Sequence, residues 1–158
     1  MPDVSLREAL GPADMTTVRI LFREYADWLG VDLCFQDFEQ ELQDLPGFYR
    51  RPQGCLLFAE SGEETAGVVG VRPLEEGVAE MKRLWVRAGF RGLGIGRRLA
   101  EASVSMAREG GYRAMVLDTL SDPRLDAARG IYETMGFRRV PAYYHNPLEG
   151  VLYYRMDL

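Results

Sequence analysis

Apolar residues recur at helical spacing in four segments of this chain. The first runs from Asp14 to Gly30, where an aspartate suited to capping precedes the periodic stretch and a glycine follows it. The other predicted helices are Phe38–Leu45, Leu93–Glu109 and Pro123–Met135. Glycine or proline stands directly after each of them, as expected where a helix ends. The pattern therefore predicts about four helices.

Shorter apolar runs between turn residues predict the strands. Three of them, Cys55–Glu60, Thr65–Val71 and Ala79–Val86, follow one another across short turns, which is typical of an antiparallel meander. The remaining predicted strands are Val4–Glu8, Ala114–Asp118, Phe137–Val140 and Val151–Asp157. Ala114–Asp118 follows a helix, and we expect it to run parallel to Ala79–Val86 because a helical crossover favours that arrangement. The last two strands should form an antiparallel pair.

These elements indicate an α+β (α/β-type) fold with a mixed, largely antiparallel central sheet of about six to seven strands. The chain has 158 residues, of which 47% are hydrophobic and 27% charged, and this composition is ordinary for a globular protein. It contains no internal repeat, low-complexity tract or linker. We therefore expect a single domain over residues 1–158.

The stretch from Ala79 to Ala100 joins a strand to a helix through a turn rich in arginine and glycine. Glycines at 92, 94 and 96 leave little side-chain bulk, so backbone N–H groups can approach a ligand closely. Unpaired N–H groups and the helix dipole both favour negative charge at a helix N-terminus. The stretch therefore predicts an anion site for a phosphorylated ligand.

Charge and reactive residues exclude several classes of function. The net charge of −5 argues against general nucleic-acid binding, although Arg91, Arg97 and Arg98 form a local basic patch beside the predicted anion site. Two isolated cysteines and a single histidine, His145, give no basis for a disulfide framework, a metal site or a Ser-His triad. We expect no metal cofactor.

The chain has no apolar run of membrane-spanning length, and its first residues lack a signal-peptide pattern. We therefore expect a cytoplasmic protein in a reduced environment, without a membrane or nucleic-acid partner.

Two motifs at a defined separation resemble those of one enzyme superfamily. The spacing Arg91-x-x-Gly94-x-Gly96, after a strand and before a helix, resembles the coenzyme A pyrophosphate loop of the GNAT acyltransferases, whose signature is Gln/Arg-x-x-Gly-x-Gly/Ala. The segment Ala128–Phe137 resembles the second motif of that family, a helix that carries a tyrosine and ends in Gly-Phe. The order of predicted elements also matches the GNAT fold, so the resemblance covers nearly the whole chain.

The resemblance implies how coenzyme A would bind. The strand Ala79–Val86 and the strand Ala114–Asp118 would splay apart in a V, and the cofactor would lie between them. The pyrophosphate would sit on N–H groups of the glycine turn, and the pantetheine arm would bond along the preceding strand as if it were an added strand. The cofactor-binding residues so implied are Leu84, Trp85, Val86, Arg91, Gly92, Leu93, Gly94, Ile95, Gly96 and Arg97.

The resemblance also implies catalytic roles. Tyr132 occupies the family's general-acid position, beside the thioester sulfur, and a backbone N–H near Leu84 would face the thioester carbonyl. Glu80 is the candidate base, because it lies four residues before Leu84 and therefore on the same side of the strand if no bulge intervenes. Asp118 is the second candidate for the base.

Each of these residues also has a purely structural interpretation. Tyr132 and Phe137 suit a hydrophobic core, Gly136 suits a helix C-cap, and Glu80 suits a solvent-facing position paired with Lys82 or Arg83. One position departs from the family pattern. Leu125 stands where many members carry an asparagine. The missing polar contact then has to come from another residue, for which Arg129 is a candidate.

The implied reaction is the transfer of an acetyl group from acetyl-CoA to a primary amine by direct attack. The amine would belong to a small molecule or a protein, and the enzyme would be a monomer or homodimer. The acceptor would enter between the first two helices and the loop before the last strand. Candidate lining residues there are Tyr25, Trp28, Phe35, Tyr143, Tyr144 and His145.

Two alternatives stay open. The first is a catalytically silent acyl-CoA-binding regulatory module with the same fold. The second is a nucleotide-binding domain, but Leu99 stands where a Rossmann fingerprint needs its third glycine, and no Gly-Lys-Ser/Thr follows the turn as in a Walker A loop.

Overall fold

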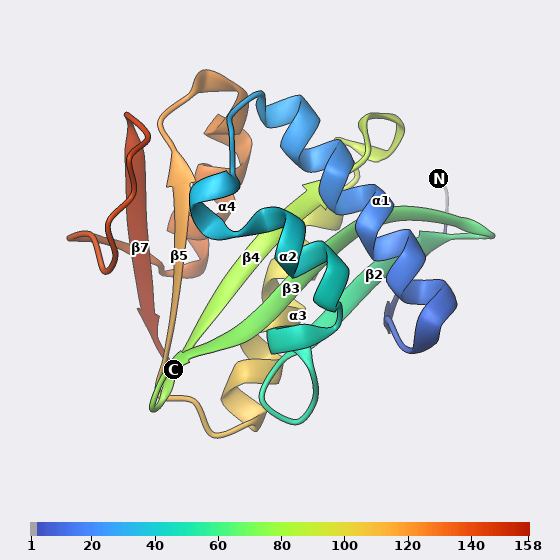
Figure 1. The fold of residues 1–158 in the computed structure, drawn as a ribbon, viewed down its shortest axis with the longest axis horizontal. Helices are drawn as coiled ribbons and strands as arrows, with labels where there is room; N and C mark the ends of the chain where they lie inside the picture. Colours follow the sequence, from blue (N-terminus) through green and yellow to red (C-terminus); the bar gives the residue numbers. More distant parts are fainter. Residues whose placement is uncertain (1–2) are drawn as a thin grey trace.

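The computed structural model describes residues 3–158, apart from the side chain of Phe35. Seven strands form one open sheet in the order β1-β2-β3-β4-β5-β7-β6 (Figure 1). In chain order they are β1 (Val4–Glu8), β2 (Cys55–Ser61), β3 (Glu64–Glu75), β4 (Val78–Val86), β5 (Ala114–Leu120), β6 (Arg138–Val140) and β7 (Val151–Asp157). All seven predicted strands are present, and β7 lies between β5 and β6.

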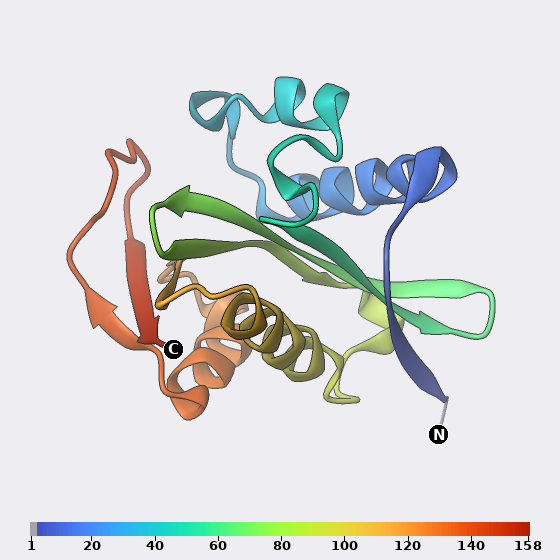
Figure 2. The same ribbon diagram turned by 90° about the horizontal axis from the view of Figure 1, so that it is seen from below.

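Four α-helices cover the two faces of this sheet. They are α1 (Gly11–Leu29), α2 (Phe38–Asp44), α3 (Ile95–Glu109) and α4 (Asp126–Met135). Figure 2 shows α1 and α2 on one side of the sheet and α3 and α4 on the other. None of these helices in the described chain combines the length and the apolar character that a membrane crossing requires. The mixed sheet with four helices confirms the predicted fold class.

The ends of two helices differ from the prediction. The first helix starts at Gly11, and Asp14 lies inside its first turn, where its carboxylate accepts a hydrogen bond from the Leu10 N–H at 2.8 Å. Pro12 explains the earlier start, because proline suits the first turn of a helix. Asp14 is therefore not the N-cap. The segment Pro123–Leu125, predicted as the start of the last helix, is a short 3₁₀ turn before α4.

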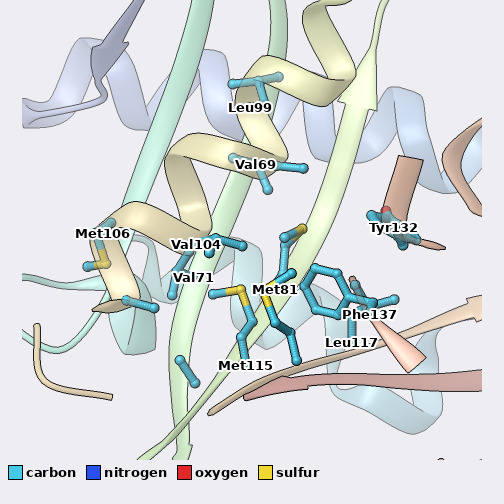
Figure 3. Packing of buried hydrophobic residues seen from close by; sticks show 14 of the residues in the cluster. Val69, Val71, Met81, Leu99, Val104, Met106, Met115, Leu117, Tyr132 and Phe137 are labelled. Carbon is cyan, nitrogen blue, oxygen red and sulfur yellow. The ribbon is translucent and has the colours of Figure 1, made fainter. Parts of the chain in front are cut away.

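The core is divided by the sheet into two main clusters. On the α3 side, Leu99 and Val104 pack against Val69 of β3 and Met81 of β4, and Tyr132 of α4 joins the same cluster (Figure 3). On the α1 side, buried residues of that helix pack against β2, β3 and β4. This α1-side cluster includes Val18, Leu21, Phe22, Leu56, Phe58, Val68 and Trp85.

The strands β4 and β5 are parallel and pair over three residues only. Their register runs from Val78↔Ala114 to Glu80↔Val116, and beyond it the strands diverge into a V (Figure 1). Both the parallel pairing and the splay were predicted. The β5 side of β4 is therefore unpaired from Met81 to Val86.

A β-bulge in β4 changes which side chains share a face. Val68 pairs with Trp85 and Gly70 with Lys82, so two residues, Arg83 and Leu84, lie opposite Val69 alone. Arg83 takes a left-handed backbone conformation with φ 61°. The extra residue reverses the alternation, and a strand with no bulge was the condition for placing Glu80 and Leu84 on one side.

The packing shows the reversal directly. Ala79 and Met81 lie in the α3-side cluster before the bulge, and Leu84 and Val86 pack against the same cluster after it. Glu80, between Ala79 and Met81, therefore lies on the opposite face from Leu84. The expectation that Glu80 and Leu84 share a face is wrong.

Candidate active site

A cavity of about 360 Å³ lies between the diverging part of β4, the glycine turn, α1 and α4. Its walls include nine of the ten predicted cofactor-binding residues. These are Leu84, Trp85, Val86, Arg91, Gly92, Gly94, Ile95, Gly96 and Arg97. The tenth, Leu93, packs against the α3-side core instead. The fold thus brings the strand and the turn onto one wall.

The glycine turn leaves backbone N–H groups free at this wall. Gly92 and Gly94 have φ of 80° and 77°, a conformation that glycine adopts without steric cost. The first helical hydrogen bond of α3 runs from the Arg98 N–H to the Gly94 carbonyl at 3.1 Å. The N–H groups of residues 95–97 precede that bond and have no helical partner. They provide the donors that an anion requires.

Gly96 has a different role from the other two glycines. A Cβ there would lie 3.5 Å from Ile131 Cδ1 and 3.8 Å from Val86 Cγ2, which are ordinary contact distances. Packing within the protein therefore does not require glycine at this position. Close approach of a ligand to the backbone is the remaining physical reason for it.

Two arginines and two tryptophans surround the mouth of this cavity. The Arg91 guanidinium lies 5.2 Å from the Trp28 ring and 5.0 Å from the Trp85 ring, and Arg124 lies 4.7 Å from Trp28. No motif or spacing in the sequence pointed to Arg124, which lies in the turn before α4. Trp28, predicted at the acceptor site, lines the cavity of the glycine turn.

The predicted basic patch is divided. Arg97 pairs with Glu101 at 2.6 Å and also lines the cavity. Arg98 donates to the Val4 carbonyl at 2.7 Å, on β1 and away from the cavity wall. Arg124 also lines the cavity, but it pairs with Asp122 at 2.9 Å and donates to the Trp28 and Leu29 carbonyls, so Arg91 is the lining arginine without a carboxylate partner among the described residues.

Tyr132 lies in the α3-side core and does not line the cavity, although Ile131, its neighbour on α4, does. Tyr132 is 6% exposed, and its ring lies 5.9 Å from Phe137 and 6.2 Å from Tyr154. Its hydroxyl makes no hydrogen bond with the described residues. Burial raises the pKa of Tyr132, and nearby Tyr25 and Asp118 raise it further, so the phenol keeps its proton at neutral pH. A protonated phenol without a partner can donate to a ligand.

Glu80 is held in a buried network. It is 1% exposed, pairs with Arg72 at 2.8 Å and accepts a hydrogen bond from the Tyr143 hydroxyl. Arg72 is its direct cross-strand neighbour on β3. The interpretation of Glu80 as a solvent-facing residue paired with Lys82 or Arg83 is therefore wrong.

Asp118 lines a second, small cavity of about 30 Å³, together with Tyr25, Gln36 and Arg83. This cavity lies between α1, the loop after it, the end of β5 and the loop before β7. The last of these places was predicted for the acceptor. The Asp118 carboxylate accepts a hydrogen bond from the Tyr144 hydroxyl. Tyr25 lines both cavities, so the two adjoin at that side chain.

The other predicted acceptor residues have separate outcomes. Tyr143 and Tyr144, consecutive on the loop before β7, bind Glu80 and Asp118 and are not open lining groups. His145 is exposed. The predicted side chain of Phe35 lies outside the described part of the structure.

Arg129 does not replace the polar side chain that many family members carry at the position of Leu125. Leu125 is 9% exposed and lines the larger cavity with an apolar surface. Arg129 donates to the carbonyls of Leu120 and Asp122 and pairs with Asp126. Its guanidinium thus stabilises the turn before α4, and the suggestion that it replaces the family asparagine is wrong. Within residues 3–158 no group of three or more His, Cys, Asp or Glu side chains is arranged to hold a metal.

Comparison with known proteins identifies the family. The sequence model of the acetyltransferase (GNAT) family matches residues 18–137. An uncharacterized N-acetyltransferase of Schizosaccharomyces pombe is 38% identical over 99% of this chain and 96% of its own length.

Two solved structures share the fold at low sequence identity. A GNAT-family acetyltransferase of Staphylococcus aureus superposes with a TM-score of 0.80 at 17% identity, over 98% of this chain and 99% of that chain. The PaiA N-acetyltransferase of Thermoplasma acidophilum, solved in complex with coenzyme A, gives a TM-score of 0.73 at 15% identity over 99% of both chains.

Proposed function

Because the chain belongs to the acetyltransferase (GNAT) family, we propose that it transfers an acetyl group from acetyl-CoA to a primary amine. The observation that carries this proposal is the junction of two cavities at Tyr25. One has the glycine turn on its wall, and the other has the Asp118 carboxylate. A donor and an acceptor bound in these cavities would meet at Tyr25, which is close enough to Tyr132 to raise its pKa.

The residues of the larger cavity fit coenzyme A. The free N–H groups of residues 95–97 suit its pyrophosphate, and Arg91 adds positive charge near the same wall. The unpaired side of β4, from Met81 to Val86, offers backbone groups to the amides of the pantetheine arm. The PaiA N-acetyltransferase was solved in complex with coenzyme A, which supports coenzyme A as the ligand of this fold.

Acetyl-CoA supplies the thioester whose acyl group is transferred. The bulge at Arg83 and Leu84 leaves β4 backbone N–H groups unpaired, and these stabilise negative charge on the acyl oxygen. Tyr132 donates its proton to the departing sulfur. A carboxylate takes the proton that the attacking amine loses, so one proton is given and one is received in each turnover.

Two carboxylates compete for the base, and the geometry favours Asp118. Glu80 is the base that the family resemblance suggests, but it is 1% exposed and both of its oxygens are already engaged by Arg72 and Tyr143. Asp118 lines the small cavity and is bound by one tyrosine hydroxyl. An amine in that cavity reaches Asp118 without breaking a buried ion pair.

The test is release of free thiol from acetyl-CoA with a panel of primary amines. We expect turnover by the wild type and a fall in kcat of about 100-fold or more for Tyr132→Phe, the usual scale for loss of a general acid. The matched control is Tyr154→Phe, which removes another buried hydroxyl, one that donates to Glu133 at 3.1 Å outside both cavities. A wild-type rate in Tyr132→Phe would remove Tyr132 from the mechanism.

One observation favours the alternative of a silent acyl-CoA-binding module. The small cavity has a volume of about 30 Å³, which is roughly the share of one water molecule in the liquid. An amine substrate enters only if the surrounding loops move. Tight binding of acetyl-CoA without thiol release on any amine would establish the module.

A further inference from the structure

A buried cation without a partner lies on the α1 face of β4. Lys82 is 8% exposed. Its ammonium makes no hydrogen bond and no ion pair within 4.0 Å to any residue in the described part of the chain. Removing an unpaired charge from water is strongly unfavourable, so a folded chain that keeps one has a reason to do so. The mechanism proposed above does not use Lys82.

The two arginines that act on Lys82 are already paired with carboxylates. Arg72 is bound to Glu80 at 2.8 Å, and Arg83 is bound to Glu41 at 3.0 Å. Each pair is neutral in itself, so neither Glu80 nor Glu41 is free to pair with Lys82. Burial lowers the pKa of Lys82, with Arg83 and Arg72 acting in the same direction and Glu80 and Asp118 acting against it.

One anion in the same group also lacks a cation. Asp118 accepts a hydrogen bond from the neutral hydroxyl of Tyr144, but no arginine or lysine of residues 3–158 lies within 4.0 Å of its carboxylate. Lys82 and Asp118 each stand two residues beyond Glu80↔Val116, the last pair of β4 and β5, where the two strands begin to diverge, and they form no ion pair. An unpaired cation and an unpaired anion thus lie near each other, more than 4.0 Å apart.

The groups around this lysine line two neighbouring cavities. Arg83 and Asp118 line the small cavity of about 30 Å³, and Glu41 and Arg72 line a cavity of about 580 Å³ beside α2. Gln36 lines both, and its buried Oε1 accepts no hydrogen bond from the described residues. Lys82 itself lines neither cavity, but Arg72 lines the 580 Å³ cavity and Arg83 the small one, so an acceptor that enters beside α2 has a route past Gln36 toward Lys82 and Asp118.

We propose that Lys82 binds a carboxylate on the acceptor, and that the acceptor is an α-amino acid. This inference rests on the proposed transferase function. A zwitterion carries one ammonium and one carboxylate on the same carbon, which complement Asp118 and Lys82 respectively. Asp118 takes one proton from the ammonium and leaves the neutral amine that attacks. The second proton, lost as the amide forms, replaces the one that Tyr132 gives to the sulfur. A simple amine leaves Lys82 unpaired, and a polyamine places a further cation beside it.

The experiment compares three acceptors that share a side chain: an L-amino acid, its carboxamide and the amine without a carboxyl group. The amino acid is the one acetylated fastest among the twenty common amino acids. We measure kcat and KM for the wild type, for Lys82→Met, which keeps the side-chain length, and for Lys82→Arg, which keeps the charge. Comparing each acceptor between variants cancels the different basicities of the three amines.

We expect the ratio of kcat/KM for the amino acid to that for its carboxamide to fall at least tenfold in Lys82→Met, mainly through KM. Lys82→Arg should recover part of the ratio. Lys82→Met should also melt at a higher temperature without ligands, because it removes an unpaired buried charge. Equal losses on all three acceptors, or a wild type indifferent to the carboxyl group, would overturn the proposal.

A binding measurement separates this proposal from the transferase function itself. If no amine releases thiol, the transferase function fails, and the melting temperature of the coenzyme A complex still reports acceptor binding. A shift produced by the amino acid in the wild type and absent in Lys82→Met supports the carboxylate site. If the amino acid shifts the melting temperature of neither the wild type nor Lys82→Met, the carboxylate site is overturned.

Discussion

Glu80 and Leu84 lie on opposite faces of β4, although they are four residues apart on one strand. A regular strand would place them on the same face, because side chains alternate with a period of two. The bulge at Arg83 and Leu84 inserts one residue and reverses the alternation. As a result, Leu84 reaches the cavity of the glycine turn, whereas Glu80 enters the network of Arg72 and Tyr143.

The first prediction separates the two candidate bases. Asp118→Asn should lower kcat by about 100-fold or more while changing the free energy of unfolding by less than about 1 kcal/mol. Glu80→Gln should lower the free energy of unfolding by about 1–3 kcal/mol, since it weakens the bond to the Arg72 guanidinium, and should keep most of the activity. Urea unfolding and thiol-release kinetics measure both. The reverse pattern would restore Glu80 as the base.

The second prediction concerns the turn glycines. Gly94→Ala should cost about 1–2 kcal/mol of stability, because its φ of 77° is unfavourable for alanine, and should also weaken acetyl-CoA binding at least tenfold. Gly111→Ala is the control, since Gly111 has φ 87°, has equal free space and lies outside the cavity wall. Its stability should fall equally with no change in affinity. Equal affinities in the two variants would argue against ligand contact at Gly94.

The third prediction tests the divided basic patch. Arg91→Ala should weaken acetyl-CoA binding roughly 10- to 100-fold, the usual effect of losing a hydrogen bond to a charged group. Arg98→Ala removes the same charge from the neighbouring α3 helix. The Arg98 guanidinium is bound to the Val4 carbonyl, so this substitution should leave the affinity for acetyl-CoA unchanged. Titration calorimetry at two salt concentrations should show a smaller difference in acetyl-CoA affinity between the two variants at the higher concentration, because salt screens the attraction. Equal losses of affinity in both variants would indicate that the arginines act only through their overall positive charge and that Arg91 does not contact the ligand.

The fourth prediction concerns the pair that supports the bulge. Glu41→Gln leaves the Arg83 guanidinium, whose side chain is 4% exposed, without its counter-charge. We expect a loss of about 3–5 kcal/mol, as is usual when one partner of a buried pair is removed. Glu39→Gln is the matched control on the same helix, because its pair with Arg23 is more than half exposed on both sides and should contribute less than about 1 kcal/mol.

The same pair should make stability depend on pH. Burial raises the pKa of Glu41, but Arg83 and Tyr49 more than offset this, and the net pKa is lowered. The pair therefore stabilises the fold fully above the unfolded value of about 4.3, and this stabilisation is lost as the pH falls through the folded pKa. Unfolding experiments between pH 7 and pH 3 should show a shallower acid decline for Glu41→Gln than for the wild type. Parallel curves would contradict the assigned pKa shift.

Features that depend on neighbouring residues in the chain were predicted well. The strand, glycine turn and helix from Ala79 to Glu109 are encoded by local apolar spacing and by backbone preferences, so nine of the ten predicted cofactor residues share one wall. Positions fixed by distant contacts were not predicted. Trp28 and Arg124 meet at the cavity mouth although 96 residues separate them, and Tyr143 reaches Glu80 across 63 residues.

The sequence by itself determined the order of helices and strands and the glycine turn between β4 and α3, because each follows from residues a few positions apart. The roles of that turn and of Tyr132 came from the family resemblance and stay proposals. Only the tertiary structure decided the face on which Glu80 lies and the isolation of Lys82. One inserted residue in β4 reverses a face, and no local pattern marks it. An ion pair depends on which strands and loops the fold brings within 4.0 Å, so the unpaired lysine becomes visible only when its neighbours are found bound to one another.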